Sequence, residues 1–135
     1  MSKAYSAACK AAVPEFTATV YFELTNEETD FSTKTCIPCQ GGVPALNEEE
    51  IGGFISKIDS RWEVIENHHL YREWKFSDFK TALDFVNIAG NICEVENHHA
   101  DFELSWGSVK VKIFTHKIDG LVESDFILAA KFDKI

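Results

Sequence analysis

Apolar and polar residues alternate with a period of two in four short segments, and this pattern predicts four β-strands. The segments cover residues 62–64, 70–76, 102–106 and 109–116. Asn67, His68 and His69 lie between the first two segments, and Gly107 and Ser108 between the last two. Polar residues and glycine favour tight turns, so each pair is expected to form an antiparallel hairpin.

Three segments show the spacing of amphipathic helices instead. The first begins after Asn47, a good N-cap with Glu50 three residues later, and its pair Gly52 and Gly53 indicates that another backbone packs closely there. A second helix is predicted from Ser77, and a third from about Ser124. Apolar residues occupy one stripe of the first helix and two faces of the second. The stripe is Ile51, Phe54, Ile55 and Ile58, and the two faces are Phe79, Leu83, Val86 and Cys93, and Phe85, Ile88, Ile92 and Val95.

The resulting order is helix, two strands, helix, two strands, helix. It predicts an α+β domain in which three helices cover one face of a four-stranded antiparallel sheet. Residues 16–24 also alternate, which predicts an extra N-terminal strand, and the polar residues 25–33 are expected to form a loop. The open edges of a small sheet and the second apolar helix face predict self-association.

Size and charge restrict the classes of partner. The chain has 135 residues with 45% hydrophobic content, which fits one compact core, and its formal net charge is -9. Such an acidic surface disfavours direct binding to nucleic acid or to anionic membranes. We recognise no signal peptide and no apolar run of about 20 residues, so we expect a cytoplasmic or nuclear protein with reduced thiols.

Cys36 and Cys39 form a Cys-x-x-Cys motif beside Pro38 and the glycines at 41–42. Such a pair is found in redox sites and as half of a zinc site, but the sequence offers no second thiol pair to complete four ligands. The motif is therefore interpreted as part of a tight loop.

The tripeptide Asn-His-His occurs at 67–69 and again at 97–99. The first copy falls in a predicted hairpin turn and is interpreted as surface. In the second, His98 lies near the end of the long helix, and Glu94, four residues earlier, shares its face if the helix reaches that far. Strand ends and helix ends meet at the rim of a sheet, so these histidines are expected to share a cleft with residues from later elements. The expected members are His98, His99, His116 and Asp125.

Three histidines in one cleft provide donor and acceptor groups for general acid–base catalysis near neutral pH. From the pattern alone, capping and polar surface roles are equally well supported. A zinc site is disfavoured because adjacent His98 and His99 diverge and no His-Glu-x-x-His spacing is present. Ser105 and Ser108 lack the setting of an activated nucleophile.

The segment 94–102 resembles the signature of the pterin-4a-carbinolamine dehydratase family, in which an acidic residue is followed after three positions by a histidine pair and an aromatic residue. The similarity continues through later residues and upstream to the cysteine motif. It covers residues 36–135 and leaves 1–35 as an N-terminal extension. The matching later residues are Trp106, 109–113, Thr115, His116, Gly120, Leu121, Asp125, Phe126 and 128–131.

The resemblance implies removal of the hydroxyl group from a 4a-hydroxytetrahydropterin, giving quinonoid dihydropterin and water. It implies proton transfer by His98 and His116, with His99 binding the pterin or assisting the acid. No metal and no bound cofactor is implied, because the pterin is the substrate. The residues implied to contact the pterin are Ala100, Trp106, Thr115, Lys117 and Ile118, with Glu94 and Asp125 orienting the histidines.

Ala100 departs from the family, which usually has proline there, and we expect a looser loop. The resemblance also implies a homodimer or homotetramer. A protein-binding role is the alternative, because some family members are dimerisation cofactors of a homeodomain transcription factor.

Overall fold

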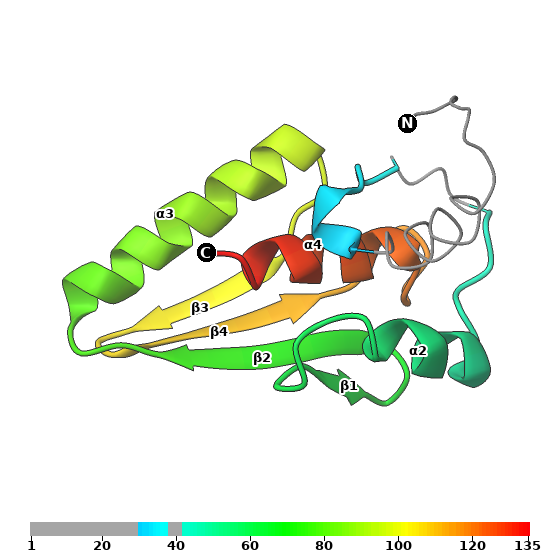
Figure 1. Cartoon of the computed structure of the whole chain (residues 1–135), viewed down its shortest axis with the longest axis horizontal. Coiled ribbons are helices and arrows are strands. Elements are labelled where there is room, and N and C mark those ends of the chain that lie inside the picture. Colours follow the sequence, from blue (N-terminus) through cyan, green and yellow to red (C-terminus); the bar gives the residue numbers. More distant parts are fainter. Residues whose placement is uncertain (1–29, 38–41) are drawn as a thin grey trace, which may run out of the picture. The chain divides into compact units, whose positions relative to one another are not determined.

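The computed structural model describes residues 30–37 and 42–135. The strand predicted at 16–24 and the cysteine at position 39 lie outside the described residues. Within this part of the chain the order of helices and strands is as predicted, and the α+β class is confirmed (Figure 1). The elements are η1 (Phe31–Thr33), α2 (Glu48–Ile55), β1 (Glu63–Ile65), β2 (His69–Lys75), α3 (Phe79–Glu96), β3 (Asp101–Ser105), β4 (Ser108–Ile113) and α4 (Glu123–Phe132).

The four strands form one antiparallel sheet in the order β1-β2-β4-β3. Residues 66–68 join β1 to β2, and Glu66 and Asn67 have φ angles of 54° and 53°, the left-handed pair of a tight hairpin turn. In the sheet centre, Leu70 of β2 pairs with Ile113 of β4. The sheet therefore brings the start of β2 next to the end of β4.

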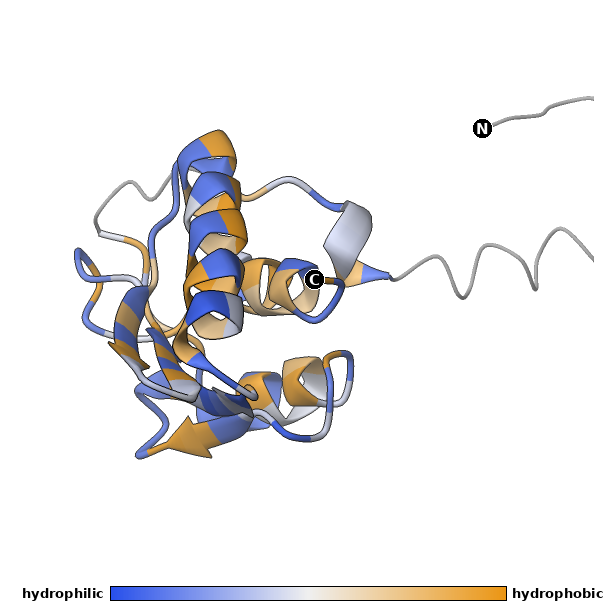
Figure 2. Cartoon of the chain, turned by 90° about the vertical axis from the view of Figure 1, so that its left-hand side faces the viewer, coloured by the Kyte–Doolittle hydropathy of each residue, from blue (hydrophilic) through white to orange (hydrophobic). Residues whose placement is uncertain are grey.

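Helices α3 and α4 lie on one side of this sheet (Figure 1). The strands alternate as an amphipathic sheet requires: Val109, Val111 and Ile113 are buried, whereas Lys110 is exposed. The hydropathy colouring shows the same alternation along the strands (Figure 2). The core lies between the sheet and the helices, and the other face of the sheet carries polar residues.

Helix α2 has the predicted start. Oδ1 of Asn47 accepts the Glu50 N–H at 2.8 Å, and the Glu50 carboxylate accepts the Asn47 N–H at 2.9 Å. The close backbone contact predicted at Gly52 and Gly53 is wrong, because a Cβ built on either glycine meets nothing within 4 Å. Phe54 instead fixes the helix, with its ring centroid 5.4 Å from that of Phe126 in α4.

Helix α3 begins at Phe79, two residues after the predicted Ser77, because Asp78 is the N-cap and accepts the Thr81 N–H at 2.9 Å. Its buried stripe lies between the two predicted apolar faces and includes small residues that allow close packing. Both flanks of the stripe are exposed. The stripe is Ala82, Phe85, Ala89 and Cys93, and the exposed flanks carry Phe79, Leu83, Ile88 and Val95.

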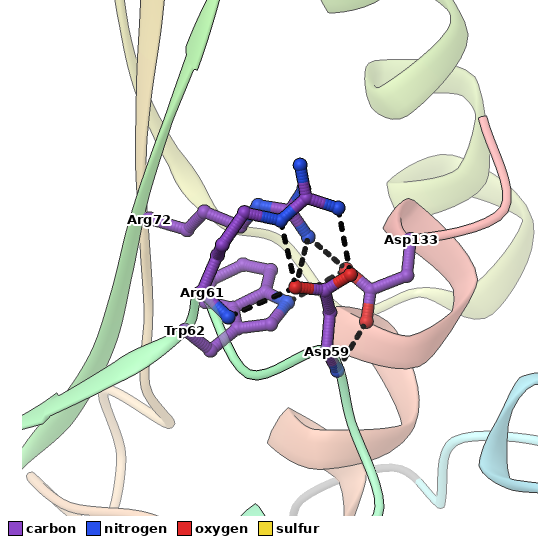
Figure 3. Close-up of polar contacts among 5 residues, drawn as sticks. All are labelled: Asp59, Arg61, Trp62, Arg72 and Asp133. Atoms are coloured by element: carbon purple, nitrogen blue, oxygen red, sulfur yellow. Dashed lines mark hydrogen bonds and ion pairs between the residues drawn. The ribbon is translucent and has the colours of Figure 1, made fainter.

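A buried polar network joins β2 to the end of α4 and to the segment before β1 (Figure 3). Nη1 of Arg72 donates to Asp133 at 2.6 Å, and Nε1 of Trp62 donates to the same carboxyl group at 2.7 Å. The Asp59 N–H donates to Asp133 at 3.0 Å. Burial raises the pKa of Asp133 and lowers that of Arg72, because both groups lose water. The network fixes the register of α4 against the sheet, and α4 contributes to the site described next.

Candidate active site

The end of helix α3 places His98. Asn97 follows the helix in the left-handed conformation, with φ 54° and ψ 40°. Its N–H donates to the Glu94 carbonyl at 3.3 Å, and the His98 N–H donates to the Cys93 carbonyl at 3.1 Å. This pair of bonds is the Schellman motif, which Asn tolerates better than most residues. The chain turns back at Asn97, and the His98 side chain is consequently buried.

Asp125 holds the His98 ring from the first turn of α4. Nε2 of His98 lies 2.7 Å from Oδ1 of Asp125, which is fully buried. The same carboxylate accepts the Thr115 hydroxyl at 2.9 Å and the Val122 N–H at 2.8 Å. A carboxylate acceptor requires that Nε2 of His98 carry a proton, so in the neutral ring Nδ1 has the free lone pair.

Glu94 pairs with His99 and not with His98. A shared helix face for Glu94 and His98 requires the helix to reach His98, and this condition is not met, because α3 ends at Glu96. Oε2 of Glu94 instead lies 2.5 Å from Nε2 of His99, at an exposed position. Each adjacent histidine therefore has its own carboxylate, one buried and one on the surface.

His116 lies in a turn after β4. The strand ends at Ile113, and the Thr115 N–H donates to the Gly120 carbonyl at 2.9 Å to close the turn 115–120. The His116 ring packs against Phe114 with centroids 4.1 Å apart, and its Nε2 lies 3.8 Å from Oδ2 of Asp101. His116 is exposed and able to meet a ligand.

The three histidines line one surface hollow of about 350 Å³. Thr115 and Lys117, which the family resemblance implies as pterin contacts, also line it. The structure does not bring the other predicted contacts to the hollow: Ala100 packs against the core, Ile118 lies in the turn without lining it, and Trp106 is 67% exposed in the β3–β4 turn. The complete lining is Asn97, His98, His99, Phe114, Thr115, His116 and Lys117.

Sequence reasoning missed Asn97 and Phe114 as lining residues. Phe114 continues the outward-facing positions of Lys110 and Lys112. An aromatic residue on this face is a feature of the sequence that could have indicated a lining residue. The structure also brings His68 of the first Asn-His-His copy next to Asp119, with Nε2 and Oδ1 2.7 Å apart. No local pattern predicts that contact, because the residues are distant in sequence.

Cys36 and Cys93 are buried, and their surroundings disfavour the reactive thiolate form. The Cys36 thiol donates to the Ser124 carbonyl at 3.5 Å, and burial together with nearby Glu96 raises its pKa to about 12. Burial likewise raises the pKa of Cys93. Residues 30–37 and 42–135 contain no cluster of three His, Cys, Asp or Glu side chains arranged to hold a metal ion.

None of the helices within the described ranges is both long and apolar enough to cross a membrane.

Comparisons with known proteins agree on one family. The family profile described as pterin 4 alpha carbinolamine dehydratase matches residues 44–135. Two proteins named "Putative pterin-4-alpha-carbinolamine dehydratase", from Alkaliphilus metalliredigens and Rubrobacter xylanophilus, are 53% and 47% identical over 105 and 107 residues. The matches cover 78% and 79% of this chain and 95% and 99% of those proteins.

A solved structure is also similar. It is described as a transcriptional coactivator/pterin dehydratase from Brucella melitensis, with a TM-score of 0.62 and 28% identity. The match covers 67% of this chain and 96% of that chain. The chain belongs to the pterin-4a-carbinolamine dehydratase family, and its activity is that of a hydro-lyase acting in pterin recycling.

Proposed function

We propose that the hollow binds a 4a-hydroxytetrahydropterin and that its histidines catalyse the dehydration by general acid–base chemistry. The observation that carries this proposal is the meeting of His98, His99 and His116 around one hollow from two separate segments. Hydroxide is a poor leaving group, so an acid must protonate the 4a-oxygen as the C4a–O bond breaks. A base takes the N5 proton, and the electron pair left on N5 forms the C4a–N5 double bond of the quinonoid product.

His98 and His116 carry out these two proton transfers: one donates to the 4a-oxygen and the other accepts the proton of N5. His98 is held by Asp125 at Nε2, which leaves Nδ1 of the neutral ring with a free lone pair, whereas His116 is exposed and packs against the Phe114 ring. One fixed and one accessible imidazole suit a substrate whose donor and acceptor atoms, N5 and the 4a-hydroxyl, are close together. A positioned acid or base of this kind contributes about 10²–10⁴-fold to a rate.

His99 contacts the pterin or assists the acid step, with its Nε2 held by Glu94. Thr115 has a double role, since it lines the hollow and its hydroxyl donates to Asp125. The Lys117 side chain is exposed beside the hollow and is placed to meet the polar edge of the pterin.

The test is the turnover of freshly generated 4a-hydroxytetrahydropterin, followed as quinonoid dihydropterin appears, with the uncatalysed rate subtracted. Wild type is compared with His98→Ala, His116→Ala and the surface control Lys75→Ala. Acceleration by wild type and by the control, with a loss of about 10²-fold or more in both histidine variants, supports the proposal. No acceleration by folded wild type contradicts the dehydration, and full activity in both histidine variants contradicts their roles.

We further propose that the protein self-associates through α3. Phe79 and Leu83 on one flank, and Ile88 and Val95 on the other, are exposed apolar side chains on the same helix. Their burial against a second copy removes apolar area from water. Sedimentation analysis of wild type and Val95→Glu tests this, and a monomeric wild type contradicts it.

A protein-binding role is the second candidate function, supported by the coactivator in the description of the Brucella structure. Binding of a partner protein is expected to survive His98→Ala and His116→Ala, which separates it from the dehydratase activity. Loss of that binding in both variants contradicts a separate binding role.

A further inference from the structure

The first Asn-His-His copy lies beside the turn that carries His116. His68 is the last residue of the β1–β2 turn, and its Nε2 lies 2.7 Å from Oδ1 of Asp119, three residues after His116. The contact joins the hairpin β1–β2 to the turn 115–120. The contact therefore links His68, which has no role in the proposed proton transfers, to the segment that forms one wall of the hollow.

Ring packing joins the same elements a second time. The Phe114 ring has its centroid 4.1 Å from that of His116 and 4.6 Å from that of His68. Phe114 lines the hollow, so its position matters to a bound ligand as well. A shift of the His68 ring would therefore move the Phe114 ring, against which His116 packs.

The turn itself has a conformational cost that outside contacts can offset. Asp119 has a φ of 58°, a left-handed conformation that most side chains disfavour. The Thr115 carbonyl accepts the N–H groups of Ile118 at 3.1 Å and Asp119 at 2.8 Å, which bends the chain sharply. At the end of the turn, the backbone of Gly120 packs closely against Ala45: a Cβ on Gly120 would lie 2.8 Å from the Cβ of Ala45. The His68 contact acts at Asp119, close to His116.

The two neighbouring histidines of this copy fix each other's protons. Their Nδ1 atoms lie 3.0 Å apart, so one ring must donate and the other accept. Burial and the nearby Lys112 lower the pKa of His69, which favours its neutral form. Nε2 of His68 donates to the Asp119 carboxylate, so in the neutral ring Nδ1 of His68 accepts the Nδ1–H of neutral His69.

From these contacts we infer that His68 and Asp119 are positioning residues for the dehydration, holding the turn 115–120 so that His116 stays in reach of the substrate. The inference rests on the proposed role of His116. Neither residue lines the hollow, so both act through His116 and Phe114. The His68 and Asp119 side chains are 30% and 83% exposed, so water competes for the contact and the effect is moderate.

The test compares variants that remove or preserve the contact. His68→Ala removes the donor, and His68→Gln restores an N–H group near the position of Nε2. Asp119→Gly removes the carboxylate but still accepts a positive φ, and Asp119→Asn keeps both an acceptor oxygen and the left-handed preference. Lys75→Ala is the matched control, since it breaks an exposed ion pair with Glu73 at the other end of β2.

Two readouts are measured on each folded protein: kcat and KM for the dehydration, and hydrogen exchange of the amides in residues 115–120 without substrate. We expect His68→Ala and Asp119→Gly to lower kcat about two- to fivefold with KM nearly unchanged, and to speed the exchange by a similar factor. His68→Gln and Asp119→Asn should recover most of both. The double variant should lose no more than either single variant, because the two side chains form one contact.

Unchanged kcat and unchanged exchange in His68→Ala, relative to Lys75→Ala, would overturn the positioning role. Additive losses in the double variant would overturn it too. The exchange measurement needs no substrate, so it still decides whether the contact holds the turn if wild type fails to accelerate the dehydration. That failure would count against the proposed function alone.

Discussion

Nε2 of His98 lies 2.7 Å from Oδ1 of Asp125, and this contact connects the end of α3 to the start of α4 across 27 positions of sequence. Both side chains are nearly or fully removed from solvent. A buried carboxylate is stable only when its lone pairs are used, and Thr115 and Val122 occupy the remaining sites of Asp125. The arrangement therefore supports the fold and fixes the tautomer of a histidine in the hollow.

Replacing Asp125 by alanine or by asparagine should lower the unfolding free energy and kcat to different degrees. Asp125→Ala leaves three buried donors without an acceptor and should cost about 3–5 kcal/mol of unfolding free energy. Asp125→Asn keeps the shape but puts an N–H group toward one of those donors, so we expect a smaller cost and a loss of at least about tenfold in kcat.

Urea unfolding and dehydration kinetics check these values. Thr115→Val is a useful comparison, because it removes only one donor of the network and should cost about 1 kcal/mol. A fully stable Asp125→Ala would contradict the view that this carboxylate organises the site.

Asn97 should be replaceable by glycine but not by a β-branched residue. Its φ of 54° disfavours side chains other than Asn, Asp and Gly. Asn97→Val should lose about 1–2 kcal/mol of stability and displace His98, whereas Asn97→Gly should stay within about 0.5 kcal/mol of wild type. Thermal unfolding of the two variants measures this difference, and equal stability would contradict it.

Local patterns were sufficient to predict helices α2, α3 and α4, the four strands and the two hairpin pairings, but not the pairing of β2 with β4. The alternation at residues 109–113 and the capping pair Asn47 and Glu50 each follow from local backbone chemistry. The histidine cluster could be expected from strand and helix ends meeting at one rim. Its members were predicted through family resemblance as well as position.

Other features depended on where elements end and on contacts between distant residues. Glu94 pairs with His99 because α3 ends at Glu96 and Asn97 turns the chain, so the helical i,i+4 spacing does not extend to His98. Two hydrogen bonds of the Schellman motif offset the conformational cost of the left-handed Asn97. Helical spacing in the sequence does not reveal these bonds. His68 meets Asp119 only because β2 and β4 are neighbours in the folded sheet.

The glycine pair of α2 should be a site for stabilisation. Gly53 lies inside the helix with open space where a Cβ would be, so alanine adds no clash. Gly53→Ala should raise the unfolding free energy by about 0.5–1 kcal/mol, mainly by reducing the freedom of the unfolded chain. Denaturant midpoints of wild type and Gly53→Ala compare directly. A destabilised variant would show that the position has a packing partner in the assembled protein.

The thiols of Cys36 and Cys93 should resist alkylation in the folded protein. Burial raises the pKa of both groups, that of Cys36 to about 12, so very little thiolate exists at pH 8. Brief treatment with iodoacetamide followed by peptide mass spectrometry should leave both unmodified, and addition of urea should expose both. Rapid modification of Cys36 before unfolding would revive a redox role for its motif.

Glu96 should make stability depend on pH in the acidic range. Its carboxylate accepts the Cys36 N–H at 2.8 Å and lies 3.4 Å from Nζ of Lys131. These contacts lower its pKa in the folded state below the ordinary 4.5, so the unfolded chain binds its proton more readily. The stabilisation is therefore complete above about pH 5 and is lost as the pH falls through 4.5 toward the folded pKa. Urea unfolding of wild type and Glu96→Gln from pH 3 to 7 should give a difference that is largest near neutrality and shrinks toward pH 3. A difference that is constant over this range would show that the hydrogen bond holds without the charge.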